Sequence, residues 1–141
     1  GGIFRSHLGQ FEMGFSVHLG SKSNNFAELY AVFFGIQAAL DAGFPLRHLW
    51  LESDSSFVVN CLLGATSVGV QFQALVERIL SLLDGKQWKI SHIPREGNRA
   101  ADRLANFGLS ITGERVFLFP PTWLQSIVSE EASGMPQYRF K

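Results

Sequence analysis

The chain has 141 residues, of which 46% are hydrophobic, so it is long enough for one domain with a substantial apolar core. Twelve basic and twelve acidic residues cancel, so any nucleic-acid partner has to be held by a local basic patch rather than by the overall charge. The single cysteine excludes an internal disulfide and indicates an intracellular, reducing compartment, either nucleus or cytoplasm, and no stretch reaches the roughly 18 apolar residues that a membrane-spanning helix needs.

The first forty residues predict a hairpin followed by a long helix. Apolar residues alternate from Phe11 to Leu19, which is typical of a half-buried strand, and a turn at residues 7–10 joins it to a preceding strand. The helix runs from about Asn25 to Ala42. Its buried face is predicted to consist of small and apolar residues, namely Ala31, Val32, Gly35, Ala38 and Ala39.

The middle of the chain predicts strands alternating with helices. Residues 46–54 are predicted to form a strand that is apolar at three successive positions, as in a strand covered on both faces, and residues 87–93 to form another. Helices are predicted at residues 55–63, at 70–83 and after Asn98, which is a suitable N-cap. The order of elements predicts an α/β domain with a mixed sheet over residues 1–110, followed by a partly disordered extension over residues 111–141.

Three acidic residues occupy unusual positions. Glu28 begins the buried face of the first helix, Asp54 ends the apolar strand, and Asp102 lies in the first turn of the last helix. Each has a structural alternative: Asp54 as an N-cap, Asp102 as a partner of the helix dipole, and Glu28 with its carboxylate reaching solvent. Together they are the kind of set that binds Mg²⁺, and two such ions about 4 Å apart can activate water against a phosphodiester.

The segments "SNNFAEL", "ESDS" and "SHIPREGNRAADRLA" resemble the type 1 ribonuclease H domain. They are most similar to its plant branch, including domains that follow the reverse transcriptases of non-LTR retroelements. The resemblance runs from residue 1 to about Leu109. It implies a ribonuclease H-like mixed sheet with helices on both faces, and an endonuclease that hydrolyses the RNA strand of RNA–DNA hybrids.

The resemblance also implies roles for individual residues. Glu28, Asp54 and Asp102 are the expected ligands of two Mg²⁺ ions, with Mn²⁺ as an alternative, and His92 is expected to aid proton transfer and product release. The expected substrate contacts are Asn24, Asn25, Asn98, Arg95 and Arg99. The chain is expected to be a monomer, with no membrane contact.

One departure from the family affects both fold and activity. The family has a fourth carboxylate on a first, central strand, and here Gly1 to Phe4 already correspond to the second strand, so that strand and its aspartate are missing. Glu12, the only acid among the first twenty residues, lies in the wrong part of the hairpin to replace it. Unpaired neighbouring strands would be costly. We therefore expect the sequence to be a fragment of a longer protein, with a decayed gene copy as the alternative.

Two further hypotheses about function are considered in addition to an impaired nuclease. The first is a catalytically degenerate module that binds nucleic acid, which would share all of these motifs. The second is a protein-interaction domain, supported only by aromatic residues of the extension (Phe117, Phe119 and Trp123).

Overall fold

The computed structural model describes residues 1–18, 24–64, 68–132 and 138–140. Within these ranges the elements, in chain order, are β1 (Gly2–Arg5), β2 (Phe11–Val17), α1 (Asn24–Asp41), β3 (His48–Ser53), α2 (Ser56–Leu63), α3 (Val70–Leu83), β4 (Gln87–His92), the 3₁₀ turn η1 (Arg95–Gly97), α4 (Arg99–Gly108), β5 (Glu114–Phe117), the 3₁₀ turn η2 (Thr122–Leu124), α5 (Gln125–Ala132) and β6 (Tyr138–Phe140). The predicted α/β class is confirmed. Among the residues described, no helix combines the length and the apolar character needed to cross a membrane.

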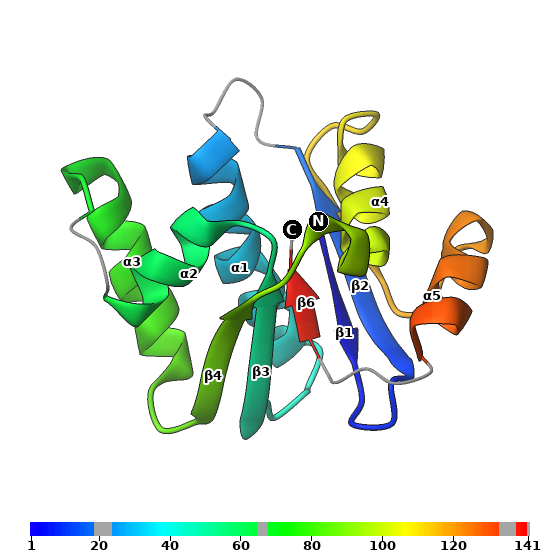
Figure 1. Ribbon diagram of the computed structural model, residues 1–141, viewed down its shortest axis with the longest axis horizontal. Coiled ribbons are helices and arrows are strands. Elements are labelled where there is room, and N and C mark those ends of the chain that lie inside the picture. Colours follow the sequence, from blue (N-terminus) through cyan, green and yellow to red (C-terminus); the bar gives the residue numbers. More distant parts are fainter. Residues whose placement is uncertain (19–23, 65–67, 133–137, 141) are drawn as a thin grey trace.

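The strands form one mixed sheet with the order β4-β3-β6-β1-β2-β5. The β1–β2 hairpin is antiparallel, and β3 and β4 are parallel. Helices α1, α2 and α3 lie on one side of this sheet, whereas α4 and α5 lie on the other, as Figure 1 shows. The predicted arrangement of helices on both faces is therefore confirmed.

The centre of the sheet contains a strand, β6, that no pattern in the sequence indicated. β6 pairs with β3 in parallel and with β1 antiparallel, so it joins the two halves of the sheet (Figure 1). This is the position between the second strand of the family and the strand that ends at Asp54. We predicted the last residues to be partly disordered; residues 133–137 and 141 lie outside the described ranges, whereas Tyr138–Phe140 is described as a strand.

The larger hydrophobic core lies between the sheet and α1, α2 and α3. The predicted face of α1 is confirmed, because Ala31, Val32, Gly35 and Ala39 are buried and Ala38 packs against the same cluster. Cys61 on α2 belongs to this core as a buried free thiol. Burial raises the pKa of that thiol, as expected for a small hydrophobic residue rather than a nucleophile.

A second, smaller core lies under α4 on the opposite face. Ile3 of β1 and Leu104 of α4 meet there with Leu124 and Val128 of the C-terminal extension. Gly108 allows α4 to approach β2 closely, because a Cβ at this position would lie 3.0 Å from the carbonyl oxygen of Val17. The described part of the extension thus packs against the domain, and β5 also pairs with β2.

The outer face of β3 is less buried than the sequence predicted. The strand was expected to be covered on both faces, and Leu49 and Leu51 are indeed buried, at 2% and 1% exposure. Trp50, between them, is only half-buried, and His48 is exposed. The reason is that α4 packs on β1 and β2, which leaves the outer face of the β3–β4 pair less covered.

The residue that caps the N-terminus of α2 is Ser55, not Asp54. Ser55 is its N-cap, and the Ser55 hydroxyl oxygen accepts a hydrogen bond from the backbone N–H of Val58 at 3.2 Å. The alternative that Asp54 serves as the N-cap is therefore wrong, since the serine after it has that role.

We expect Ser55→Ala to lower the free energy of unfolding by about 1 kcal/mol, because it removes the cap of α2. Urea denaturation followed by circular dichroism measures this loss, and Ser56→Ala, at an exposed neighbouring serine, is the matched control. Equal stability of the two variants would show that the cap contributes nothing.

We expect Arg139→Pro to destabilise the domain more than Arg139→Thr, by about 1–3 kcal/mol. Both variants lose the arginine side chain, but only proline also removes a backbone N–H from the strand in the middle of the sheet. The comparison of their urea midpoints isolates the backbone contribution. If both variants unfolded at the same urea concentration, the pairing of β6 with β1 and β3 would not stabilise the fold.

Candidate functional site

Asp54 and His92 lie together because the parallel strands that precede them are in register. The β3–β4 pairing places Ser53 beside His92, so both strands end at the same edge of the sheet. Asp54 follows β3 directly, and His92 is the last residue of β4. Ligand sites in α/β proteins lie at this carboxyl edge, which was the reason to select Asp54 from the sequence.

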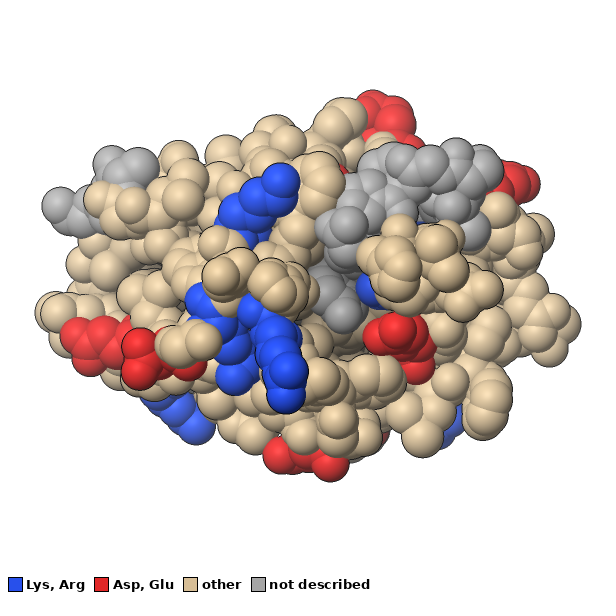
Figure 2. Space-filling view, turned by 90° about the horizontal axis from the view of Figure 1, so that it is seen from below, with Lys and Arg blue, Asp and Glu red and all other residues tan. Residues whose placement is uncertain are grey.

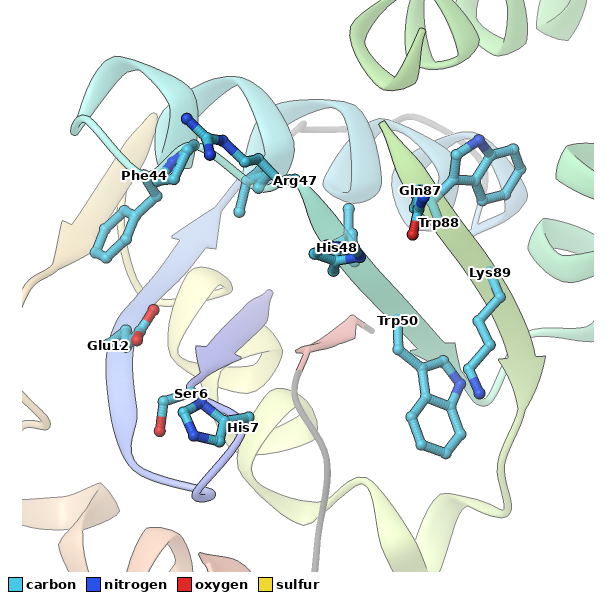
Figure 3. Close-up of a pocket in the computed structure, with 13 residues that line it drawn as sticks. Ser6, His7, Glu12, Phe44, Arg47, His48, Trp50, Gln87, Trp88 and Lys89 are labelled. Atoms are coloured by element: carbon cyan, nitrogen blue, oxygen red, sulfur yellow. The ribbon is translucent and has the colours of Figure 1, made fainter. Parts of the chain in front are cut away.

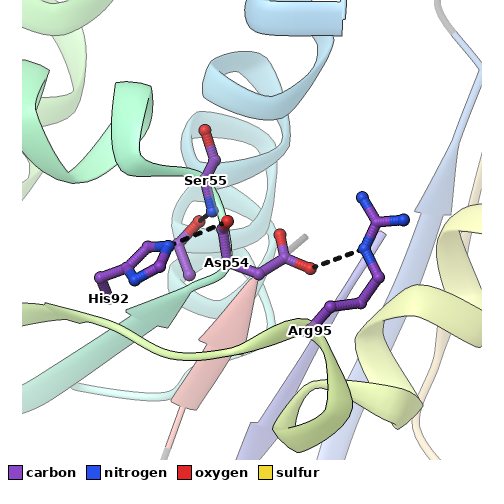
Figure 4. Close-up of polar contacts among 5 residues, drawn as sticks. Asp54, Ser55, His92 and Arg95 are labelled. Atoms are coloured by element: carbon purple, nitrogen blue, oxygen red, sulfur yellow. Dashed lines mark hydrogen bonds and ion pairs between the residues drawn. The ribbon is translucent and has the colours of Figure 1, made fainter.

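The Asp54 carboxylate is almost completely enclosed. Its side chain is 6% exposed, and its Oδ2 lies 3.9 Å from Nε of Arg95, whose side chain is 74% exposed. Figure 4 shows the guanidinium of Arg95 reaching the carboxylate from the η1 turn. A buried carboxylate needs such compensation, and here a cation of the same chain supplies part of it. The guanidinium is therefore part of the environment of Asp54.

His92 contacts the backbone of Asp54 rather than its carboxylate. The Nε2 of the ring lies 3.2 Å from the Asp54 carbonyl oxygen, as the dashed line in Figure 4 marks. The imidazole is exposed, so it is accessible to solvent and to a bound molecule. In the tautomer that carries the proton on Nε2, this contact is a hydrogen bond donated to the carbonyl, and it fixes the ring beside Asp54.

The predicted residues of α1 lie on its first turns. Glu28 is half-buried, at the head of the small and apolar face described above, and Asn24 and Asn25 are exposed at the beginning of the helix. Glu28 thus lies at the head of the buried face, as the sequence pattern predicted, and the roles of Asn24 and Asn25 stay predictions. The two asparagine side chains are accessible to a large ligand such as a nucleic-acid duplex.

The remaining predicted residues surround the start of α4. Asn98 occupies the N-cap position and is completely buried, but its side chain makes no capping hydrogen bond. Asp102 is half-buried, and its backbone N–H donates to the carbonyl oxygen of Asn98 at 3.0 Å. Arg99 donates from Nη1 to Oε2 of Glu130 on α5 at 2.7 Å. Arg99 thus contacts the C-terminal extension, in addition to its predicted role at the substrate.

The expected metal ligands do not form a metal site in this arrangement. Within the described ranges, no three His, Cys, Asp or Glu side chains are grouped closely enough to hold an ion. The residues present here therefore do not by themselves fit the pair of Mg²⁺ ions that the resemblance implies. The assignment of Glu28, Asp54 and Asp102 as ligands stays a prediction.

One acidic residue near this edge was not singled out from the sequence. Glu52 of β3 is 3% exposed, and its neighbours in register are Ser91 of β4 and position 139 of β6. The signal was present, because an acid within the run "LWLES" is rare in a central strand. Glu52 adds a second buried carboxylate to the segment that ends at Asp54.

Two curated relatives resemble the chain in sequence. A putative ribonuclease H protein of Arabidopsis thaliana is 33% identical over 142 residues, which cover 99% of this chain and 22% of that protein. Ribonuclease HI of Halobacterium salinarum is 37% identical over 93 residues, which cover 64% of this chain and 46% of that protein. The chain thus spans less than half the length of either relative.

Solved structures resemble the fold. RNase H1 of the halophilic archaeon Halobacterium salinarum matches with a TM-score of 0.59 and 35% identity, over 65% of this chain and 70% of that one. The N-terminal RNase H domain of Rv2228c from Mycobacterium tuberculosis, solved as a fusion with maltose-binding protein, matches with a TM-score of 0.55 and 27% identity, over 62% and 63% of the two chains. The family described as "Reverse transcriptase-like" matches residues 1–108. The chain therefore belongs to the reverse transcriptase-like family of ribonuclease H-like domains.

Proposed function

We propose that this domain binds RNA–DNA hybrids at the edge of the sheet formed by Asp54, His92 and Arg95, and that the protein of which it is a part hydrolyses the RNA strand. The observation that carries the proposal is the enclosed Asp54 carboxylate beside an exposed imidazole, at the carboxyl edge of β3 and β4 in a ribonuclease H-like fold. The exposed Arg95 guanidinium can contact a phosphate while it remains close to Asp54.

We further propose that hydrolysis is weak in this chain alone. The strand at the centre of the sheet, Tyr138–Phe140, contains no acidic residue, so the fourth carboxylate of the family has no counterpart there. Mg²⁺ remains the metal we predict for any residual activity, with Mn²⁺ as the alternative. A parent protein of the retroelement type is part of this proposal and rests on the resemblance alone; the matched region covers 22% of the Arabidopsis relative.

A second candidate is a module that binds hybrids but does not cut them. Two observations favour it: the absence of a three-ligand metal group within the described residues, and the Arg95 guanidinium at the carboxylate that a metal would need. This candidate and the impaired nuclease share the same binding edge, so cleavage separates them while binding does not.

We expect the chain to bind a labelled RNA–DNA hybrid and to cut it slowly in Mg²⁺ or Mn²⁺. Asp54→Asn should abolish this cutting, because it removes the enclosed charge, and the exposed acid variant Asp84→Asn is the matched control. Gel analysis of the labelled RNA strand measures both. Cutting that survives in Asp54→Asn would contradict the proposed site, whereas binding without any cutting in either metal would favour the module.

We expect Arg95→Ala to weaken hybrid binding and to reduce the slope of log affinity against log salt by about one. The physical reason is the loss of one exposed cation that can neutralise a phosphate. Fluorescence anisotropy at several salt concentrations measures the slope. Arg115→Ala on β5, the exposed arginine of another edge, is the control, and equal effects of the two substitutions would argue against a role for Arg95 in particular.

A further inference from the structure

A cavity of about 860 Å³ lies at the opposite end of β3 and β4 from Asp54. The first residues of both strands, the turn of the β1–β2 hairpin and the segment between α1 and β3 line it, and their labelled side chains surround the hollow in Figure 3. None of its lining residues belongs to the site described above.

The aromatic surface of this cavity is held in a fixed orientation. The indole Nε1 of Trp50 donates a hydrogen bond to Oγ of Ser91 at 2.7 Å. The ammonium of Lys89 lies 3.9 Å from the centroid of the same ring, so two contacts orient it. Trp50 is half-buried although it lies in the middle of a strand, because α4 covers the other half of this face. A pre-oriented, accessible indole is suited to stacking with a flat ligand.

The charges around the cavity are mainly positive. Arg47 and Lys89 are exposed cations in its lining, His7 and His48 are exposed as well, and Glu12 is the acid among the lining residues. Figure 2 views the end of the molecule that is lowest in Figure 1, and lysine and arginine side chains gather near its middle with acidic groups to either side. The charge of this cavity therefore suits an anionic ligand with aromatic groups better than an uncharged apolar peptide.

We propose that the cavity binds single-stranded nucleic acid, with a base stacked on Trp50 and phosphates held by Arg47 and Lys89. Proteins that bind single strands combine such aromatic platforms with cations along the backbone path. The cavity is large enough for this purpose, since ligand sites in proteins typically measure about 300–1,000 Å³.

The position of the cavity relates it to the binding edge, and this step rests on the proposed function. Six residues of strand separate His48 from Asp54, which corresponds to roughly 20 Å at about 3.3 Å per residue. Duplex rises about 3.4 Å per step, so this span equals roughly six steps. A hybrid bound at Asp54 whose duplex ends within about six steps would bring its single-stranded extension to the cavity.

The test measures the affinity of the full chain for two probes by fluorescence anisotropy. One probe is a single-stranded oligodeoxynucleotide of about ten residues, within the usual site size of such proteins, and the other is a blunt RNA–DNA hybrid. We expect Trp50→Leu, and separately the pair Arg47→Ala and Lys89→Ala, to weaken single-strand binding tenfold or more. Blunt-hybrid binding should change less than twofold. Circular dichroism establishes that each variant is folded. Arg47 and Lys89 are exposed, so the variant with both replaced by alanine tests the cavity even if Trp50→Leu disturbs the packing of the strand.

Lys86→Ala is the matched control, because Lys86 belongs to the same end of the molecule but not to the cavity lining. Single-strand binding that is unchanged in folded Trp50→Leu would overturn the inference. An equal loss in all variants, Lys86→Ala included, would also overturn it, because it would indicate attraction by general charge. Trp50-dependent single-strand binding without hybrid binding would refute the proposed function while it supports this cavity as a site.

Discussion

The continuity of the six-stranded sheet depends on backbone hydrogen bonding at its centre. The β1–β2–β5 half and the β3–β4 half do not pair with each other directly, and β6 is the strand between them in the described structure. Each inner strand presents N–H and C=O groups on the side that faces β6, and leaving such groups buried without partners is costly. A strand of three residues from the end of the chain thus allows two separate ladders to form one sheet.

This constraint extends to the candidate site. Asp54 and His92 belong to the β3–β4 half, whereas α4, which carries Asp102, packs on β1 and β2. Glu28 is on α1, which contacts β1, β2 and β6 as well as α2 and α3. The separation between the acidic residues therefore depends on how β6 joins the halves. A site divided in this way is sensitive to the identity of the central strand, even where that strand supplies no reacting group.

Local patterns predicted much of this molecule. The small face of α1, the helix at residues 70–83 and the position of Asp54 at the end of β3 follow from periodicity and from the run of apolar residues, which are local properties. The central strand could not be predicted, because three residues carry no period and their pairing depends on segments 87 or more residues away along the chain. The exposure of Trp50 and the approach of Arg95 to Asp54 depend in the same way on how far α4 and η1 extend over the sheet.

The shortness of β6 has a consequence for motion. In most sheets the outer strands open first, and the innermost amides are the slowest to exchange with solvent. Here the innermost strand has only three residues, while its neighbour β3 has six and is paired along its whole length with β4. The larger core under α1, α2 and α3 packs against both halves of the sheet, whereas the ladders that join the halves through β6 contain only three residue pairs each. The least durable line of backbone pairing therefore runs through the interior of the sheet rather than along its rim.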